Sequence, residues 1–419
     1  MNSARRDPEL VAALLRALLL SFGPAVSNSF ARFAYALVLP AMREDLSLSY
    51  AQAGWLNTAN AIGYLAGAIL TRIWVGRIGN RSLFIGGMLV TSLAILGAGL
   101  TRDPTLLSLM RGLGGLGGAA VFICGGTLSA NLLPERPALA TTTIAIYFAG
   151  GGIGLMLSGI GVPLLFEARG GQAWPLAWQA MGLMSLAMSA ATFWVALRTA
   201  EPGRLPAGKA LSPGGAAAPV DDRPASASIA PLRRALISYL CFGLGYIGYM
   251  TFIIAWMREH DAHTHTVIAA WTLLGLASWL APTVWSGPLR RWPGGRPLAA
   301  AMATLTAGAT LPLLHTSAPV MLVSATLFGL AMFSTPSAIQ SLVKKGVATS
   351  GWGEAMAGFT VVFAAGQIAG PLLAGWMADL TGSLAPGLAV SAISLVAGVL
   401  LALTQREVIA EEENSRGTR

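Results

Sequence analysis

Charged residues are scarce in this chain of 419 residues. They make up 11% of it, whereas an average soluble domain contains about 25%. Hydrophobic residues make up 54%. A chain so poor in charge excludes an ordinary soluble protein and predicts an integral membrane protein that is embedded in the lipid bilayer.

Residues for catalysis, metal binding and nucleotide binding are also lacking. The two cysteines, Cys124 and Cys241, lie in apolar runs, so neither a disulfide framework nor a metal site is implied. No Walker-type loop occurs. His260, His263 and His265 are interpreted as part of a solvated loop, with a weak metal site as the alternative. We therefore expect no enzyme, no catalytic residue, no metal and no cofactor.

Twelve apolar runs of roughly membrane-spanning length follow one another along the chain. The first six lie at 11–39, 51–71, 82–100, 105–130, 138–166 and 175–197. The second six lie at 233–257, 267–289, 297–314, 319–343, 354–378 and 385–404. Because hydrocarbon offers the backbone no hydrogen-bond partner, each run is predicted to be a helix, which gives an all-α membrane protein.

A long polar segment separates the sixth run from the seventh. Residues 198–234 are rich in Pro, Gly, Ala and Ser and have no apolar period, which is typical of a flexible linker. We therefore divide the chain into an N-terminal six-helix bundle, a cytoplasmic linker, a C-terminal six-helix bundle and a cytoplasmic tail. Their bounds are 1–197, 198–232, 233–404 and 405–419.

Basic residues are distributed unevenly between the two sets of loops. Twenty fall on the side that carries the termini and the linker, and four on the other: Arg43, Arg102, Arg169 and Arg258. Since Lys and Arg accumulate in cytoplasmic loops, both termini are predicted to be cytoplasmic. These positions also explain the net charge of +9 without a nucleic-acid partner.

Short motifs of the first half recur in the second half at a nearly constant shift. The pairs are Gly79-x-Arg81 with Gly294-x-Arg296, Phe148–Ile153 with Phe363–Ile368, and Gly115-Leu116 with Gly329-Leu330. Because six spans separate the members of each pair, the two halves share one orientation. The sequence therefore predicts a parallel repeat about an axis along the membrane normal, as in twelve-helix secondary transporters.

The segment after the second span reads Gly76-Arg77-Ile78-Gly79-Asn80-Arg81. It resembles the signature loop of the major facilitator superfamily, usually Asp-Arg-x-Gly-x-Arg, with Gly76 in place of the aspartate. We expect Arg77, Gly79 and Arg81 to form a gating loop, in which the arginines close the cytoplasmic side by contacting helix C-terminal carbonyls or nearby acids.

Further motifs resemble other parts of this superfamily. They are Arg111-x-x-Gly114-Gly115-x-Gly117, Gly366-x-x-x-Gly370-Pro371, Ala31–Tyr35 with Leu39–Met42, and Gly54 with Asn60–Tyr64. The first two resemble its fourth-helix arginine motif and its eleventh-helix bend, and the others its YbfB/YjiJ-type branch. The resemblance implies a bacterial inner-membrane transporter that alternates access between two six-helix bundles.

Two arginines lie in the middle of predicted spans, where a charge costs at least about 2.5–3.5 kcal/mol. Arg32 in the first span and Arg111 in the fourth fall at similar depth, and the resemblance implies that both helices line the cavity. Two guanidinium groups in one cavity predict an anion site. The alternative is that either arginine bonds to backbone carbonyls or extends to the membrane surface.

Polar and aromatic residues at helical spacing complete the predicted substrate site. They are Asn28 and Tyr35 around Arg32, Asn60 near Asn57 and Tyr64, Tyr246 and Tyr249 near Phe242, and Gln367, which replaces a glycine of the first repeat. Interhelical packing is the alternative for each.

No Asp or Glu lies in the middle of a span, which favours an anionic or neutral cargo over a cation. We expect a monomeric secondary transporter for a small organic anion. One alternative is a multidrug or metabolite exporter with an aromatic cavity and structural arginines. Another is a membrane sensor or scaffold that transports nothing.

Overall fold

The computed structural model describes residues 8–133, 136, 139–199, 230–348 and 351–408. All regular elements among them are helices, and twelve helical segments are long and apolar enough to cross a membrane. The predicted all-α membrane fold is therefore confirmed. Most of the predicted linker and of the C-terminal tail lies outside the described residues.

The first half comprises the helices before residue 200. They are α1 (Pro8–Leu20), α2 (Phe22–Pro24), η1 (Ala25–Phe33), α3 (Tyr35–Asp45), α4 (Tyr50–Ile78), α5 (Asn80–Ala98), α6 (Pro104–Ala130), α7 (Ala140–Arg169), the short η3 (Gly171–Ala173) and α8 (Trp174–Arg198). The second half comprises those after residue 229. They are the short η4 (Ala230–Leu232), α9 (Arg233–Glu259), α10 (Thr264–Arg291), α11 (Arg296–Leu314), α12 (Ala318–Met332), α13 (Ser334–Gly346), α14 (Trp352–Thr381) and α15 (Leu384–Leu403).

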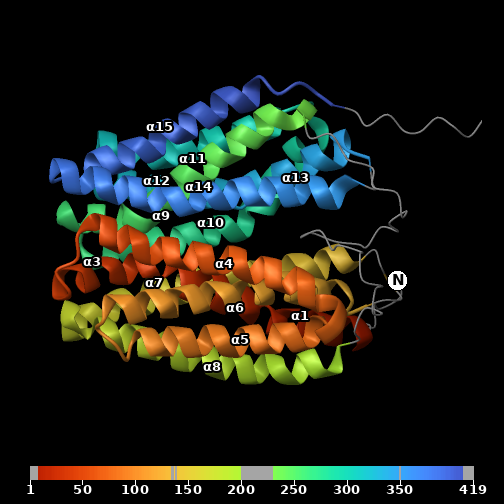
Figure 1. The fold of residues 1–419 in the computed structure, drawn as a ribbon, viewed down its shortest axis with the longest axis horizontal. Helices are drawn as coiled ribbons and strands as arrows, with labels where there is room; N and C mark the ends of the chain where they lie inside the picture. The colour runs from red at the N-terminus through yellow and green to blue at the C-terminus, as the bar shows by residue number, and fades with distance from the viewer. Residues whose placement is uncertain (1–7, 134–135, 137–138, 200–229, 349–350, 409–419) are drawn as a thin grey trace, which may run out of the picture.

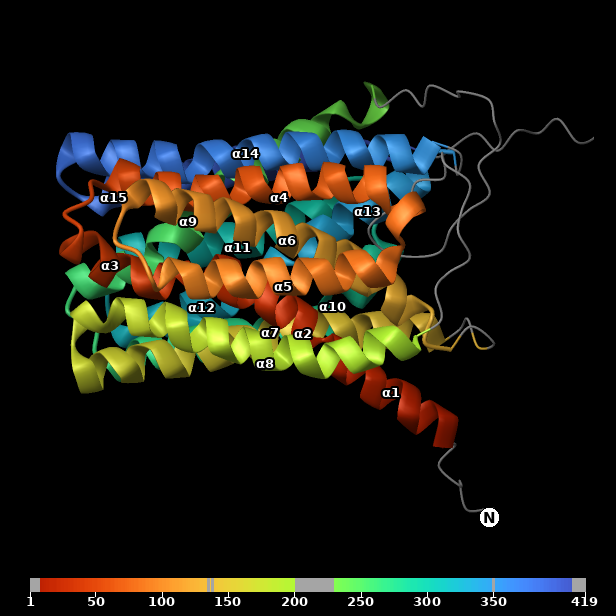
Figure 2. The ribbon, with the colours of Figure 1, turned by 60° about the horizontal axis from the view of Figure 1, so that its bottom comes forward.

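The two halves lie side by side with their long helices nearly parallel (Figure 1). The boundary between them is formed mainly by α4 against α14 and by α7 against α10. Glycines allow the close approach: a Cβ at Gly54 would collide with the carbonyl oxygen of Pro371. We call the end of the molecule opposite the start of α1, where α3 ends and α4 begins, the distal end (Figure 2).

The turn between α4 and α5 is shorter than predicted. The basic segment 72–81 was expected to be a loop, but α4 continues to Ile78 and α5 begins at Asn80. Gly79 alone makes the turn, with φ 88°, and Gly294 in the matching turn of the second half has φ 56°. Both backbones need the conformation that glycine adopts most readily, so the repeated glycine has a structural reason.

The first and tenth spans are each broken, although a single helix was expected in both. The first contains η1, a π-helical stretch in which the N–H of Ala34 donates to the carbonyl of Ser29 at 2.7 Å. The tenth breaks at Phe333, three residues before Pro336, which has no N–H for the carbonyl of Met332. Such irregular turns re-aim side chains and occur frequently at functional sites.

Candidate functional site

Arg32 is a buried cation that the described protein leaves unsatisfied. The residue lies on η1 and is 7% exposed. Its Nη2 atom is buried and has no hydrogen-bond partner within the described residues. Its Cζ lies 5.4 Å from the ring centroid of Tyr64 on α4. Because a buried charge is costly without acceptors, this guanidinium calls for a bound anion or water.

The second half contributes a buried amide to the same region. Tyr246 on α9 lies close enough to Arg32 and Tyr64 to interact with them electrostatically. Its hydroxyl lies beside the side chain of Gln367 on α14. Gln367 is 3% exposed, and its Nε2 forms no hydrogen bond of normal geometry among the described residues, although the Tyr246 hydroxyl lies beside it. We call Arg32, Tyr64, Tyr246 and Gln367 the Arg32 site. The two unpaired atoms in it are both N–H donors, from opposite halves.

Aromatic rings cover one side of this site. Phe363 on α14 stacks on α9, with ring-centroid distances of 4.7 Å to Tyr239 and 5.4 Å to Phe242. Phe242 in turn stacks on Tyr246 at 5.0 Å. The ring of Phe33, from the first half, lies 6.4 Å from that of Tyr246. We call these five residues the aromatic wall.

Arg111 lies close to Arg32 but is bonded differently. Its Nη1 donates to the carbonyl of Ala31, the residue before Arg32 in the chain. Its Nε donates to the carbonyl of Leu56 at 3.3 Å, and its Nη2 to Oδ1 of Asn57 at 3.0 Å. All three guanidinium nitrogens thus donate to the protein, and they fasten η1 and α4 to α6.

The other predicted binding residues divide between the site and the packing around it. Tyr35 donates to the carbonyl of Ala53 at 2.6 Å, and the Nδ2 of Asn60 donates to the carbonyl of Arg111 at 3.0 Å. The Tyr249 hydroxyl bonds to Ser324 at 2.6 Å inside the second half. Asn28 is buried and forms no hydrogen bond through its side chain in the described structure. Tyr246 and Gln367 therefore join Arg32, whereas Tyr35, Asn60 and Tyr249 bond within the protein.

Phe33, Tyr239 and Phe363 belong to the aromatic wall but are not among the residues predicted from the sequence. The signal for Phe363 is present in the sequence, since its motif repeats that of Phe148. Phe33 follows Arg32 directly but gives no comparable signal, because its contact with Tyr246 exists only where the two halves meet.

The predicted gating loop has one arginine in contact with a helix end. Arg81 donates through Nη2 to the carbonyl of Thr199, just after the end of α8, at 2.5 Å. Arg77 is exposed on the last turn of α4. The Arg81 contact stays within the first half.

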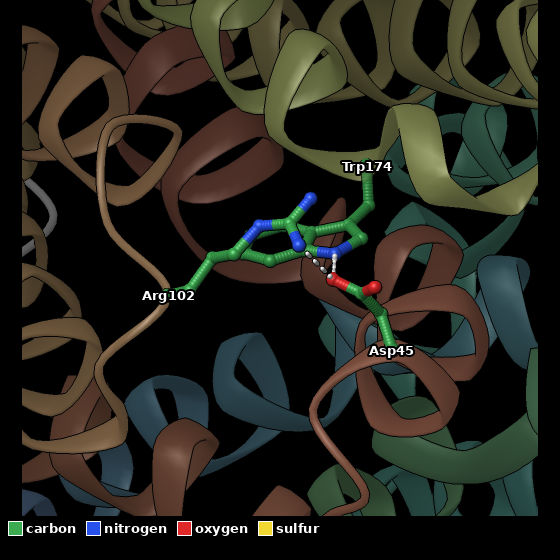
Figure 3. Close-up of polar contacts among 3 residues, drawn as sticks. All are labelled: Asp45, Arg102 and Trp174. Carbon is green, nitrogen blue, oxygen red and sulfur yellow. Dashed lines mark hydrogen bonds and ion pairs between the residues drawn. The ribbon is translucent and has the colours of Figure 1, made fainter.

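At the distal end, the carboxylate of Asp45 connects separate segments of the first half. Asp45, at the end of α3, accepts a hydrogen bond from Nε1 of Trp174 at 2.8 Å. It also pairs with Arg102, at 3.5 Å, from the turn between α5 and α6 (Figure 3). These contacts join three separate stretches of the first half.

Comparisons of the sequence with known proteins relate the chain to transporters. The family described as "Uncharacterised MFS-type transporter YbfB" matches residues 25–403. The gallate transporter of Pseudomonas putida is 28% identical over 179 residues, which is 42% of this chain and 38% of that protein. The cephamycin export protein CmcT of Amycolatopsis lactamdurans is 28% identical over 156 residues, 32% of this chain and 31% of its own length.

Solved structures of transporters share the fold. The nucleoside transporter NupG superposes with a TM-score of 0.69 at 13% identity, covering 93% of this chain and 97% of that one. This likeness concerns the fold alone. The chain aligns with less than two fifths of the length of either curated relative above.

Proposed function

The chain belongs to the family of YbfB-type MFS transporters, and on this premise we propose that it moves a small organic anion by alternating access. The Arg32 site binds the anion between the two halves. A site that touches both halves can be opened to either side by a relative movement of those halves, while the ligand remains in contact with residues of each.

The observation that carries the anion assignment is the pair of unused donors, Arg32 Nη2 and Gln367 Nε2. Both atoms are buried, and a donor without an acceptor costs about 1–3 kcal/mol. A carboxylate has two oxygens that accept hydrogen bonds and a charge that offsets the guanidinium. A cationic cargo would leave both donors unpaired and would be repelled by Arg32.

The aromatic wall favours a cargo with an apolar, planar part. Rings that stack on one another at 4.7–5.4 Å offer a flat face on which another ring can stack. The name of the gallate transporter relative points in the same direction, because gallate is an aromatic acid. We therefore take aromatic carboxylates as the first class of cargo to test.

Arg32 and Arg111 have different roles in this proposal. Arg32 contacts the cargo, whereas Arg111 positions η1 by bonding to the carbonyl of Ala31. Asn28, on the same π-helix and without a side-chain hydrogen bond, provides a further polar contact. Tyr35, Asn60 and Tyr249 act through the helices that they hold in place.

The orientation of the chain follows from its basic residues. We place both termini in the cytoplasm of a bacterium and the distal end on the periplasmic side of the inner membrane. Each chain carries one complete Arg32 site, so a monomer suffices for transport.

An exporter of larger apolar compounds is the second candidate. The aromatic wall favours an apolar cargo, and the name of the cephamycin exporter relative points to export. In that case uncharged aromatic compounds would bind as well as acids do, and the charge on Arg32 would contribute little to affinity.

A thermal-shift experiment on purified protein separates the two candidates, because a ligand that binds the folded state raises the unfolding temperature. We expect benzoate and gallate to stabilise the protein, and benzamide and lipophilic cations to have no effect. Arg32→Gln should abolish the stabilisation, while Arg169→Gln, a matched change at an exposed arginine, should preserve it. Equal stabilisation by benzoate and benzamide would support the exporter.

A further inference from the structure

The start of α4 is capped by both halves of the molecule. Within the first half, Ser49 and Gln52 form a capping box, with the N–H of Gln52 donating to Ser49 Oγ at 3.2 Å. The N–H groups of Tyr50 and Ala51 donate instead to Asp379, at the end of α14, at 2.7 and 2.8 Å. Because the first turn of a helix lacks intrahelical acceptors, the second half completes the cap of a first-half helix.

The side chain of Tyr50 makes a second connection at this point. Its hydroxyl donates to a carboxylate oxygen of Glu259, at the end of α9. Its ring packs edge-on against Phe252, with centroids 6.0 Å apart, and the Cζ of Arg43 lies 3.6 Å from its centroid. Tyr50 is 8% exposed. One residue of α4 thus contacts both α9 and α14.

Two further hydrogen bonds join α4 to the second half deeper in the molecule. Asn57 donates through Nδ2 to Thr251 at 2.6 Å, and Thr58 donates to the carbonyl of Ile368 at 2.8 Å. The Oδ1 of Asn57 accepts from Arg111, which also contacts the residue before Arg32. A continuous line of contacts therefore connects the distal surface with the Arg32 site.

We propose that Asp379, Tyr50 and Glu259 form a latch that holds the distal side of the carrier closed and must open in each transport cycle. The inference rests on the alternating access proposed above, and it names residues that set the balance between the two states. Separation of α4 from α9 and α14 at the distal end breaks the three latch hydrogen bonds together. Because Asp45 ties α3 to α8 and to Arg102, the first half can separate as one unit (Figure 3).

The latch is strong enough to shift a conformational equilibrium without being permanent. Its hydrogen bonds are charge-assisted, but Asp379 and Glu259 are exposed, so water competes for both carboxylates. Removal of the Asp379 carboxylate is therefore expected to change the ratio of open to closed molecules by about tenfold, and removal of the Tyr50 hydroxyl by about threefold.

The test measures the distance between the halves at the distal end by pulsed electron paramagnetic resonance. Spin labels at Ala168→Cys and Thr316→Cys, both exposed, report the separation in a background where Cys124 and Cys241 are replaced by Ala. The matched control is Asp103→Ala, because Asp103 also caps a distal helix start, through the N–H of Leu106 at 2.8 Å, but within the first half.

We expect Asp379→Ala and Tyr50→Phe to increase the population with the longer distance, and Asp103→Ala to leave it unchanged. Tyr50→Phe removes only the hydroxyl and keeps the ring contacts, so it provides the test if Asp379→Ala does not fold. Distance distributions identical to the parent in both latch variants would overturn the proposal, as would an equal change in Asp103→Ala. The measurement needs no ligand, so it tests the latch even if the cargo is not an anion.

Discussion

Arg111→Lys tests whether Arg111 positions the binding site, because it preserves the positive charge and removes the planar guanidinium. In the parent protein three nitrogens reach three acceptors on two neighbouring segments: Ala31 O, Leu56 O and Asn57 Oδ1. A single ammonium at this position meets one of them well. The change therefore leaves acceptors without a donor rather than removing a charge.

The loss of stability expected in Arg111→Lys depends on which of the three acceptors keep another hydrogen-bond donor. The carbonyl of Ala31 retains a long contact of 3.5 Å with Nδ2 of Asn60, whereas Asn57 Oδ1 loses its donor. With about 1–3 kcal/mol for each buried group left unpaired, we expect a loss of roughly 2 kcal/mol in the free energy of unfolding. Because Ala31 precedes Arg32, the affinity for an aromatic carboxylate should fall about tenfold, or by about 1.4 kcal/mol.

The assay combines thermal unfolding with ligand titration on the same purified samples. Arg169→Lys, at an exposed position, is the control and should match the parent in both. If a higher ligand concentration restores in Arg111→Lys the thermal stabilisation that the parent shows, the change has weakened binding without removing the site. An Arg111→Lys protein that is as stable as the parent and binds as tightly would refute the positioning role.

Three further changes probe other parts of the account. Gln367→Ala should weaken carboxylate binding by about fivefold in a titration while leaving the unfolding temperature nearly unchanged, because its Nε2 bonds to no described protein group. Gly54→Leu should lower the unfolding temperature and block transport, because its side chain would collide with the backbone of Pro371. Gly79→Ala should cost about 1–3 kcal/mol in an unfolding assay, because its φ of 88° with ψ 158° is a backbone conformation that is strained for a residue with a Cβ.

The twelve spans could be predicted because apolar length is a property of each segment by itself. The course of the first span could not, since it depends on neighbouring helices: Ser29 on η1 donates its hydroxyl to the carbonyl of Gly151 on α7 at 2.5 Å. The break at Phe333 had a local signal in Pro336, three residues later. A proline alone does not predict a break, however, because Pro163 and Pro371 lie inside helices that continue past them.

The candidate site was harder to predict because similar residues have different partners. Arg32 and Arg111 are both arginines in apolar spans, and the acceptors that Ala31, Leu56 and Asn57 supply to Arg111 distinguish them. Tyr246 and Tyr249 lie three residues apart on α9, yet Tyr249 faces Ser324 inside its own half. Such differences depend on which helices are adjacent, and this is set by the tertiary fold.

The most direct test of the central claim is uptake of labelled gallate and benzoate into proteoliposomes that contain the purified protein. We predict uptake that saturates, is inhibited by unlabelled aromatic carboxylates but not by benzamide, and is lost in Arg32→Gln while Arg169→Gln retains it. Uptake that is equal in the parent and Arg32→Gln proteins, or inhibition by benzamide as strong as by benzoate, would contradict an anion site at Arg32.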